Sequence, residues 1–166
     1  MSDLSVFDVD RNILSTIHTR FVLVALNVSK DPGTPDWSNF HLGRRDFMLR
    51  DALVETPLWG AYLTGIVKGL PEKKYHEVLR RLRREPNLHA RSIASLRAEL
   101  EAFGPEKPVL VALGVTVERI LRAEFSNFQI ARMPHYSAPV SRSQLREEVI
   151  SISSLNRAAA HRGGSL

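Results

Sequence analysis

The 166-residue chain contains no cysteine. Disulfide bonds, thiolate nucleophiles, cysteine-ligated zinc and cysteine-held iron–sulfur clusters are therefore excluded. The sequence also lacks HExxH, the glycine-rich GxGxxG and Walker patterns, and the GxSxG elbow of serine hydrolases. Any chemistry has to come from histidines, carboxylates, amides and hydroxyl groups, and we expect no cofactor.

Long hydrophobic runs are missing as well. No apolar stretch approaches the roughly 20 residues of a membrane-spanning helix, and the N-terminus lacks the pattern of a signal peptide. We expect a cytoplasmic protein without a membrane partner. The length suits one domain, which we assign to residues 1–157, followed by a frayed tail over residues 158–166.

The chain is moderately basic, because its 23 lysines and arginines outnumber its 18 acidic residues and give a formal net charge of +5. Such an excess favours a polyanionic partner, since each phosphate contact releases counterions. The densest basic cluster contains Arg80, Arg81, Arg83 and Arg84. A solvated helix face and a nucleic-acid contact both remain open for this cluster.

Two continuously apolar runs, residues 21–26 and 108–114, have the pattern of strands that are buried on both faces. Residues 59–67 and 128–131 predict two further strands. Helical patterns lie between them, so the order of elements indicates right-handed crossovers. We predict a three-layer α/β/α fold around a central, mainly parallel four-stranded sheet.

The helical patterns supply details that the structure can check. Residues 72–84 predict a charged helix whose apolar stripe consists of Tyr75, Val78, Leu79 and Leu82. Ser141 and Gln144 have the spacing of a capping box at the start of the last helix.

Ligands of open parallel sheets bind beyond the carboxyl ends of the strands. Three loops are expected there, and the first is unusually long and rich in aromatic residues, which is typical of functional loops. The residues that we place in one cleft are Asn27, Phe40, His41, Thr64, Lys68, His135 and Ser137.

The motifs in these loops resemble those of the uracil-DNA-glycosylase-like superfamily. The first strand ends in Ala25-Leu26-Asn27, the middle segment is Thr64-Gly65-Ile66-Val67-Lys68, and the last strand leads into His135-Tyr136-Ser137. A bacterial branch of about this length is most similar, with Asn-Phe-His, Gly-Ala-Tyr-x-Thr and Pro-His-Tyr-Ser in the same order. The likeness spans most of residues 20–140 and implies the fold of that superfamily.

The resemblance also implies a function, which is hydrolysis of the N-glycosidic bond of a deaminated or modified base in duplex or single-stranded DNA. Asn27 would orient the attacking water, and His135 would donate a hydrogen bond to the departing base. The remaining residues would bind substrate: Phe40 or Trp37 by stacking on the base, with His41 and Thr64 nearby, and Ser137, Lys30 and Lys68 toward flanking phosphates.

Plainer interpretations stand beside these roles. Asn27 is a residue type that is common in turns, and His135 can serve as a structural hydrogen-bonding residue. Phe40 and Trp37 can close a loop over the core. A metal site at His41, Asp46 and His135 has no supporting spacing. Gly65 stands where the superfamily pattern has a base-reading side chain, and this favours a second hypothesis. That hypothesis is a catalytically inactive module of the same fold that binds nucleic acid or a nucleotide.

Overall fold

A computed structural model describes residues 15–27, 45–70 and 72–155. Its sheet has four parallel strands in the order β2-β1-β3-β4. They are β1 (His18–Asn27), β2 (Ala61–Val67), β3 (Val109–Leu113) and β4 (Ile130–Met133). The helices are α2 (Asp46–Leu53), α3 (Tyr75–Arg84), α4 (Pro86–Glu101), α5 (Val115–Glu124) and α6 (Arg142–Ser153).

The strand order puts β1 inside the sheet. Leu23 of β1 lies opposite Leu63 of β2 on one side and opposite Val111 of β3 on the other. The chain therefore crosses from β2 over β1 to β3 by way of α3 and α4, and reaches β4 through α5. All four carboxyl ends consequently lie at one edge of the sheet, which we call the carboxyl edge.

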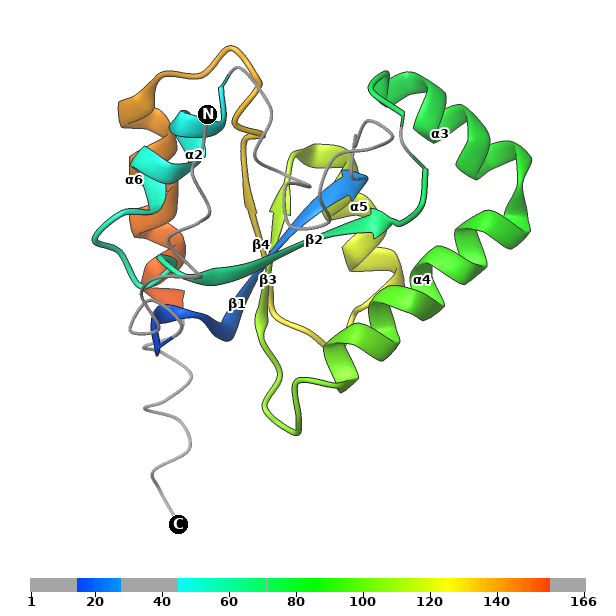
Figure 1. Cartoon of the computed structure of the whole chain (residues 1–166), viewed down its shortest axis with the longest axis horizontal. Coiled ribbons are helices and arrows are strands. Elements are labelled where there is room, and N and C mark those ends of the chain that lie inside the picture. The colour runs from blue at the N-terminus through cyan, green and yellow to red at the C-terminus, as the bar shows by residue number, and fades with distance from the viewer. Residues whose placement is uncertain (1–14, 28–44, 71, 156–166) are drawn as a thin grey trace.

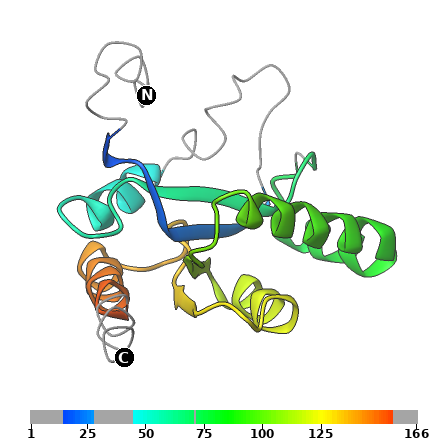
Figure 2. The same cartoon turned by 90° about the horizontal axis from the view of Figure 1, so that it is seen from below.

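Helices cover both faces of the sheet (Figures 1 and 2). Side chains of β1 alternate between the two cores: Phe21, Leu23 and Ala25 pack with α2 and α6, whereas Val22, Val24 and Leu26 pack with α3, α4 and α5. Phe21, Val22, Leu23 and Val24 are at most 1% exposed. Because burial of each such side chain stabilises the fold by about 1.5–3 kcal/mol, β1 is the anchor of both layers.

Local sequence signals explain several boundaries. Ser141 and Gln144 form the reciprocal hydrogen bonds of a capping box at the start of α6. Pro86 occupies the first turn of α4, where its missing N–H leaves no helical hydrogen bond unmade. Gly60 precedes β2 with a φ of 82°, and a Cβ there would lie 2.0 Å from the Thr16 carbonyl oxygen. Only glycine fits this close approach.

These observations confirm the predicted α/β architecture with helices on both faces, and they confirm the capping box. Strands β2 and β4 start later than expected, at Ala61 and Ile130. The predicted stripe of α3 is correct for Val78 and Leu82, which are buried, but Tyr75 is 51% exposed. None of the described helices is long and apolar enough to cross a membrane.

Candidate functional site

Asn27 ends β1 at the carboxyl edge, opposite Val67 of β2. Its Nδ2 donates hydrogen bonds to the carbonyl oxygens of Leu70, at 3.3 Å, and Glu72, at 2.8 Å. The side chain therefore fastens the segment that leads from β2 into α3. Both bonds use the amide nitrogen. Among the described residues no donor binds Oδ1, so this oxygen can accept a hydrogen bond from a ligand.

His135 lies two residues beyond the end of β4. Its Nδ1 is 3.2 Å from the backbone nitrogen of Ser137 and 2.7 Å from the Ser137 Oγ. A backbone N–H can only donate, so Nδ1 has to be the acceptor and the ring proton belongs on Nε2. Burial lowers the pKa of His135, which favours the same neutral form. The site thus offers a neutral imidazole with an Nε2–H donor.

Tyr136 packs beneath this histidine. The two rings stack with centroids 4.4 Å apart and planes inclined by 25°, while Tyr136 also contacts the core between the sheet and α2 and α6. Burial, with a smaller contribution from the nearby Asp46 carboxylate, raises the pKa of Tyr136 to about 12. Tyr136 therefore supports the imidazole as a neutral phenol.

Gly114 separates the two predicted catalytic residues. It follows β3, which lies between β1 and β4 in the sheet, and it is the residue before α5. At the usual strand spacing of about 4.8 Å, the ends of β1 and β4 are about 10 Å apart. A Cβ at Gly114 would meet no described atom within 4 Å. Gly114 therefore lies between the ends of the strands that carry Asn27 and His135, and no described atom occupies the position of a side chain there.

Thr64 and Lys68 belong to a different group of side chains. Thr64 is 5% exposed and donates to Glu99 Oε1 of α4 at 3.0 Å. Tyr62 donates to the same carboxylate oxygen at 2.6 Å. Lys68 Nζ forms an ion pair with Glu99 and lies 3.1 Å from Thr64 Oγ1. The expectation that Thr64 and Lys68 share a cleft with His135 and Ser137 finds no support, because the pair bonds to α4.

Burial also explains why Lys68 is bound to this carboxylate. Removal from water lowers its pKa, and its ammonium is stabilised by an adjacent carboxylate. The Glu99 carboxylate accepts hydrogen bonds from three donors, Tyr62, Thr64 and Lys68. This cluster joins β2 to α4, and the Lys68 ammonium is used within it.

The remaining predicted substrate-binding residues, Lys30, Trp37, Phe40 and His41, lie outside the described residues, as does the tail over residues 158–166. Their assignments remain predictions. Within the described ranges, the structure contains no group of three or more histidine and acidic side chains arranged to hold a metal ion.

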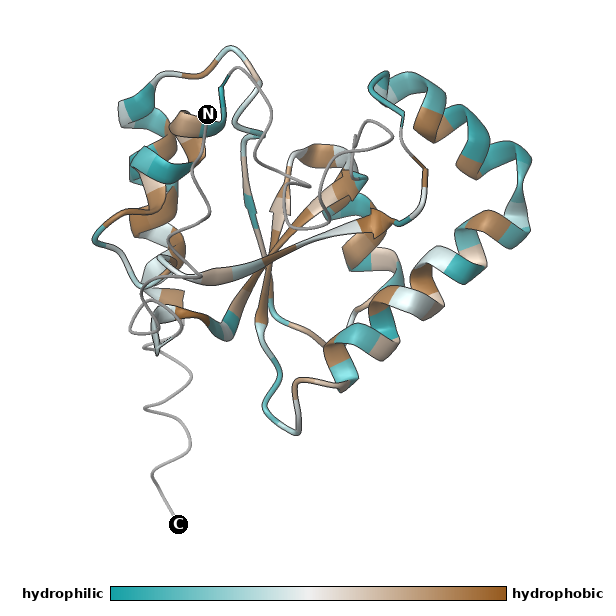
Figure 3. Ribbon diagram, in the orientation of Figure 1, coloured by the Kyte–Doolittle hydropathy of each residue, from teal (hydrophilic) through white to brown (hydrophobic). Residues whose placement is uncertain are grey.

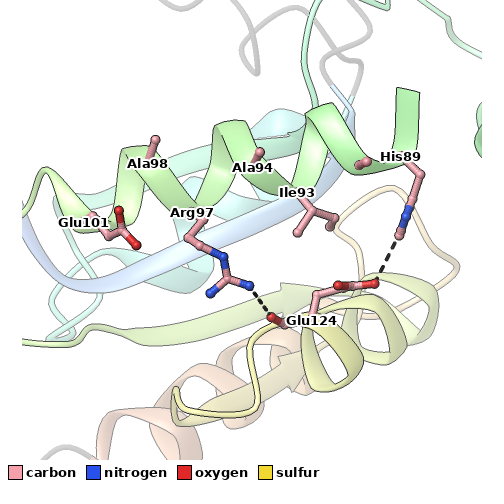
Figure 4. Close-up of a pocket in the computed structure, with 8 residues that line it drawn as sticks. His89, Ile93, Ala94, Arg97, Ala98, Glu101 and Glu124 are labelled. Atoms are coloured by element: carbon pink, nitrogen blue, oxygen red, sulfur yellow. Dashed lines mark hydrogen bonds and ion pairs between the residues drawn. The ribbon is translucent and has the colours of Figure 1, made fainter. Parts of the chain in front are cut away.

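A groove of about 440 Å³ lies elsewhere, between α4 and the end of α5 (Figure 4). Arg97 reaches across it to the Glu124 carbonyl oxygen at 2.7 Å, and His89 Nε2 is 3.8 Å from the Glu124 carboxylate. The groove contains none of the residues that the sequence predicted for the site. Arg97 and His89 both contact Glu124, and we assign no function to the groove.

Two features of the carboxyl edge were not predicted from the sequence. Gly114 was visible as a glycine between a buried strand and a helix, and its φ of 100° is a conformation that favours glycine. Tyr75 and Thr116 come together through a hydrogen bond between their hydroxyl groups. Nothing in the sequence pairs these two residues, which are 41 positions apart.

Comparison of the chain with protein-family models, with curated proteins and with solved structures found no match in any of the three.

Proposed function

We propose that this protein is a glycosylase-like hydrolase that removes a deaminated or otherwise modified base from DNA. The observation that carries the proposal is the neutral His135 with its proton on Nε2, fixed by the Ser137 backbone N–H. A base that leaves its sugar carries the electrons of the broken bond as an anion. A fixed neutral donor stabilises that anion without having to lose its own proton.

The other reactant in this scheme is water. Its oxygen forms the new bond to the sugar C1′ while the bond from C1′ to the base nitrogen breaks. The electron pair of that bond goes to the base, which then takes up the proton released by the water. Asn27 orients the water through Oδ1, because its Nδ2 is held by Leu70 and Glu72. An amide is no general base, so its contribution is alignment.

The space over Gly114 suits this substrate. A base turned out of the stack needs a site that admits a flat ring between its hydrogen-bonding partners. With no side chain at Gly114 and Asn27 and His135 on either side, a ring can lie close to the first turn of α5, whose cap makes no side-chain hydrogen bond. The positive end of that helix favours the charge that develops on the departing base.

The proposal is tested with duplex and single-stranded oligonucleotides that contain uracil, hypoxanthine, xanthine or mismatched thymine. Formation of abasic sites is measured under single-turnover conditions with the wild type and with His135→Ala. We expect excision of at least one of these bases, and a lower rate for the variant. Absence of excision from every substrate would refute the hydrolase.

A binding module of the same fold is the second candidate. It is favoured by the structural bonds of Asn27, which alone explain why an amide occupies that position. Gly65 supports it as well, because this residue is buried within β2 and offers no side chain to read a base. Salt-dependent binding of the same oligonucleotides without excision is the outcome that this alternative predicts.

A further inference from the structure

Tyr75 is an aromatic residue that folding leaves half exposed. It begins α3 on the same side of the helix as Val78 and Leu82, whose side chains are buried against the sheet. Tyr75 is nevertheless 51% exposed, and Val115 at the start of α5 is 49% exposed. An exposed aromatic ring next to a candidate site provides a stacking surface for a planar ligand.

The position of this ring is fixed by hydrogen bonds. The Tyr75 hydroxyl bonds to Thr116 Oγ1 in the first turn of α5, while the backbone just before α3 is held by Asn27. Tyr75 follows β2 and Thr116 follows β3, and β1 lies between those strands. The link between the two hydroxyl groups therefore passes the end of β1, where Asn27 is found.

Positive charge is concentrated in this helix and in the two residues before it. Residues 73–84 contain six lysines and arginines and one acidic residue, Glu77. This excess equals the net charge of +5 of the whole chain. In Figure 1, α3 extends beyond the sheet, and in Figure 3 most of its ribbon has the colour of hydrophilic residues.

Ion pairs neutralise only part of this charge. Arg80 pairs with Glu77, and Arg81 pairs with Glu85 at 3.0 Å. Arg83 and Arg84, at the far end of α3, are exposed and have no acidic partner among the described residues. Exposed guanidinium groups without a carboxylate partner are suited to phosphate.

We propose that α3 is a binding surface for single-stranded nucleic acid, with a base stacked on Tyr75 and phosphates bound by Arg83 and Arg84. This inference rests on the proposed function, to which it adds the path of the strand. At 3.6 residues per turn and about 1.5 Å per residue, Arg84 is about 13 Å from Tyr75 along α3 and about half a turn around it. A stacked strand advances about 3.4 Å per nucleotide, so about four nucleotides that pass around the helix connect the Tyr75 ring to the arginines at the far end.

The test measures binding of a fluorescein-labelled oligothymidine of twelve nucleotides, at several salt concentrations. The variant R83Q/R84Q should bind about tenfold more weakly at low salt, and its slope of log affinity against log salt should fall by about 1.4, since each lost contact to a single strand removes about 0.7. The control R50Q/K107Q removes two charges outside α3, and it should bind within about twofold of the wild type.

Tyr75 is tested separately from the charges. Y75A should weaken binding about tenfold without changing the salt slope, because stacking releases no counterions. Y75F loses only the bond to Thr116 and should stay within about twofold of the wild type if the ring is what binds. Thermal unfolding of each variant shows whether its fold is intact.

Three results would overturn the inference: equal losses in R83Q/R84Q and the control, wild-type affinity for folded Y75A, or tighter binding of the corresponding duplex. The oligothymidine contains no uracil, hypoxanthine or xanthine and no mismatched thymine, so the two proposals fail independently. Binding through α3 without excision refutes only the hydrolase, whereas excision without any dependence on Arg83, Arg84 and Tyr75 refutes only this surface.

Discussion

The Nδ2 of Asn27 donates a 2.8 Å hydrogen bond to the carbonyl oxygen of Glu72, 45 residues further along the chain. This bond joins the end of the central strand to the backbone just before α3. A residue that the motifs associate with catalysis therefore also has a structural role, and a substitution there changes stability and chemistry together.

We predict that Asn27→Ala lowers the free energy of unfolding by about 1–3 kcal/mol, the usual cost of leaving a partly buried hydrogen-bonding group without its partner. Urea denaturation measures this change. Asn27→Asp is the informative comparison, because it keeps the shape but points a carboxylate at two carbonyl oxygens, so it should be at least as unstable. An alanine variant as stable as the wild type would contradict the structural role.

For His135, the prediction concerns the pH dependence of excision. Burial lowers the pKa of this imidazole, so it is neutral above its ordinary value of about 6.5, and the excision rate should be flat from there to about pH 8. Removing the donor in His135→Ala should slow excision by about 10²–10³-fold, with little change in oligonucleotide affinity. A wild-type rate that rises as the pH falls through 6 would instead identify the imidazolium as the donor.

The raised pKa of Tyr136 leads us to predict a loss of stability in alkaline solution. Its pKa is raised to about 12, whereas an unfolded tyrosine ionises near 10. The stabilisation is complete below pH 10 and is lost as the pH rises toward 12, because only the unfolded state ionises in that window. At pH 11 the free energy of unfolding is lower by about 1.4 kcal/mol than below pH 10 because of this group.

The control for this effect is Tyr136→Phe, which has no phenol to ionise. Urea denaturation of both proteins at pH 9 and pH 11 isolates the contribution of Tyr136, since all other groups titrate in both. Equal losses in the two proteins would show that the Tyr136 hydroxyl is solvated.

Lys68 should not contribute to nucleic-acid affinity. Its ammonium is bound to Glu99 of α4 and to Thr64 of β2. Lys68→Met should therefore leave the affinity for oligothymidine within about twofold of the wild type, while stability falls by about 1 kcal/mol because the carboxylate loses a partner. The measurements are the salt-dependent binding described for α3 and urea denaturation. A tenfold loss of affinity would show that Lys68 leaves Glu99 to bind phosphate.

Much of the architecture follows from the sequence because it depends on local patterns. Residues 21–26 and 109–113 are apolar without helical spacing, and such segments become strands only where both of their faces are covered. Ser141 and Gln144 interact across a single helical turn, so four neighbouring residues determine where α6 starts. The placement of Asn27 and His135 at the carboxyl edge follows in turn from a parallel sheet, in which every strand ends at the same side.

Tertiary structure alone decided which partners these side chains acquire. The side chains of Thr64 and Lys68 bond to Glu99 of α4. Side chains alternate between the two faces of β2, which directs Thr64 toward Glu99, a residue 35 positions away. Tyr75 has the spacing of a core residue, yet α3 begins at the edge of the sheet and leaves Tyr75 51% exposed. Periodicity determines which side of an element a residue occupies, but the lengths and angles of the packed elements determine whether that side is covered, and these depend on residues distant in the chain.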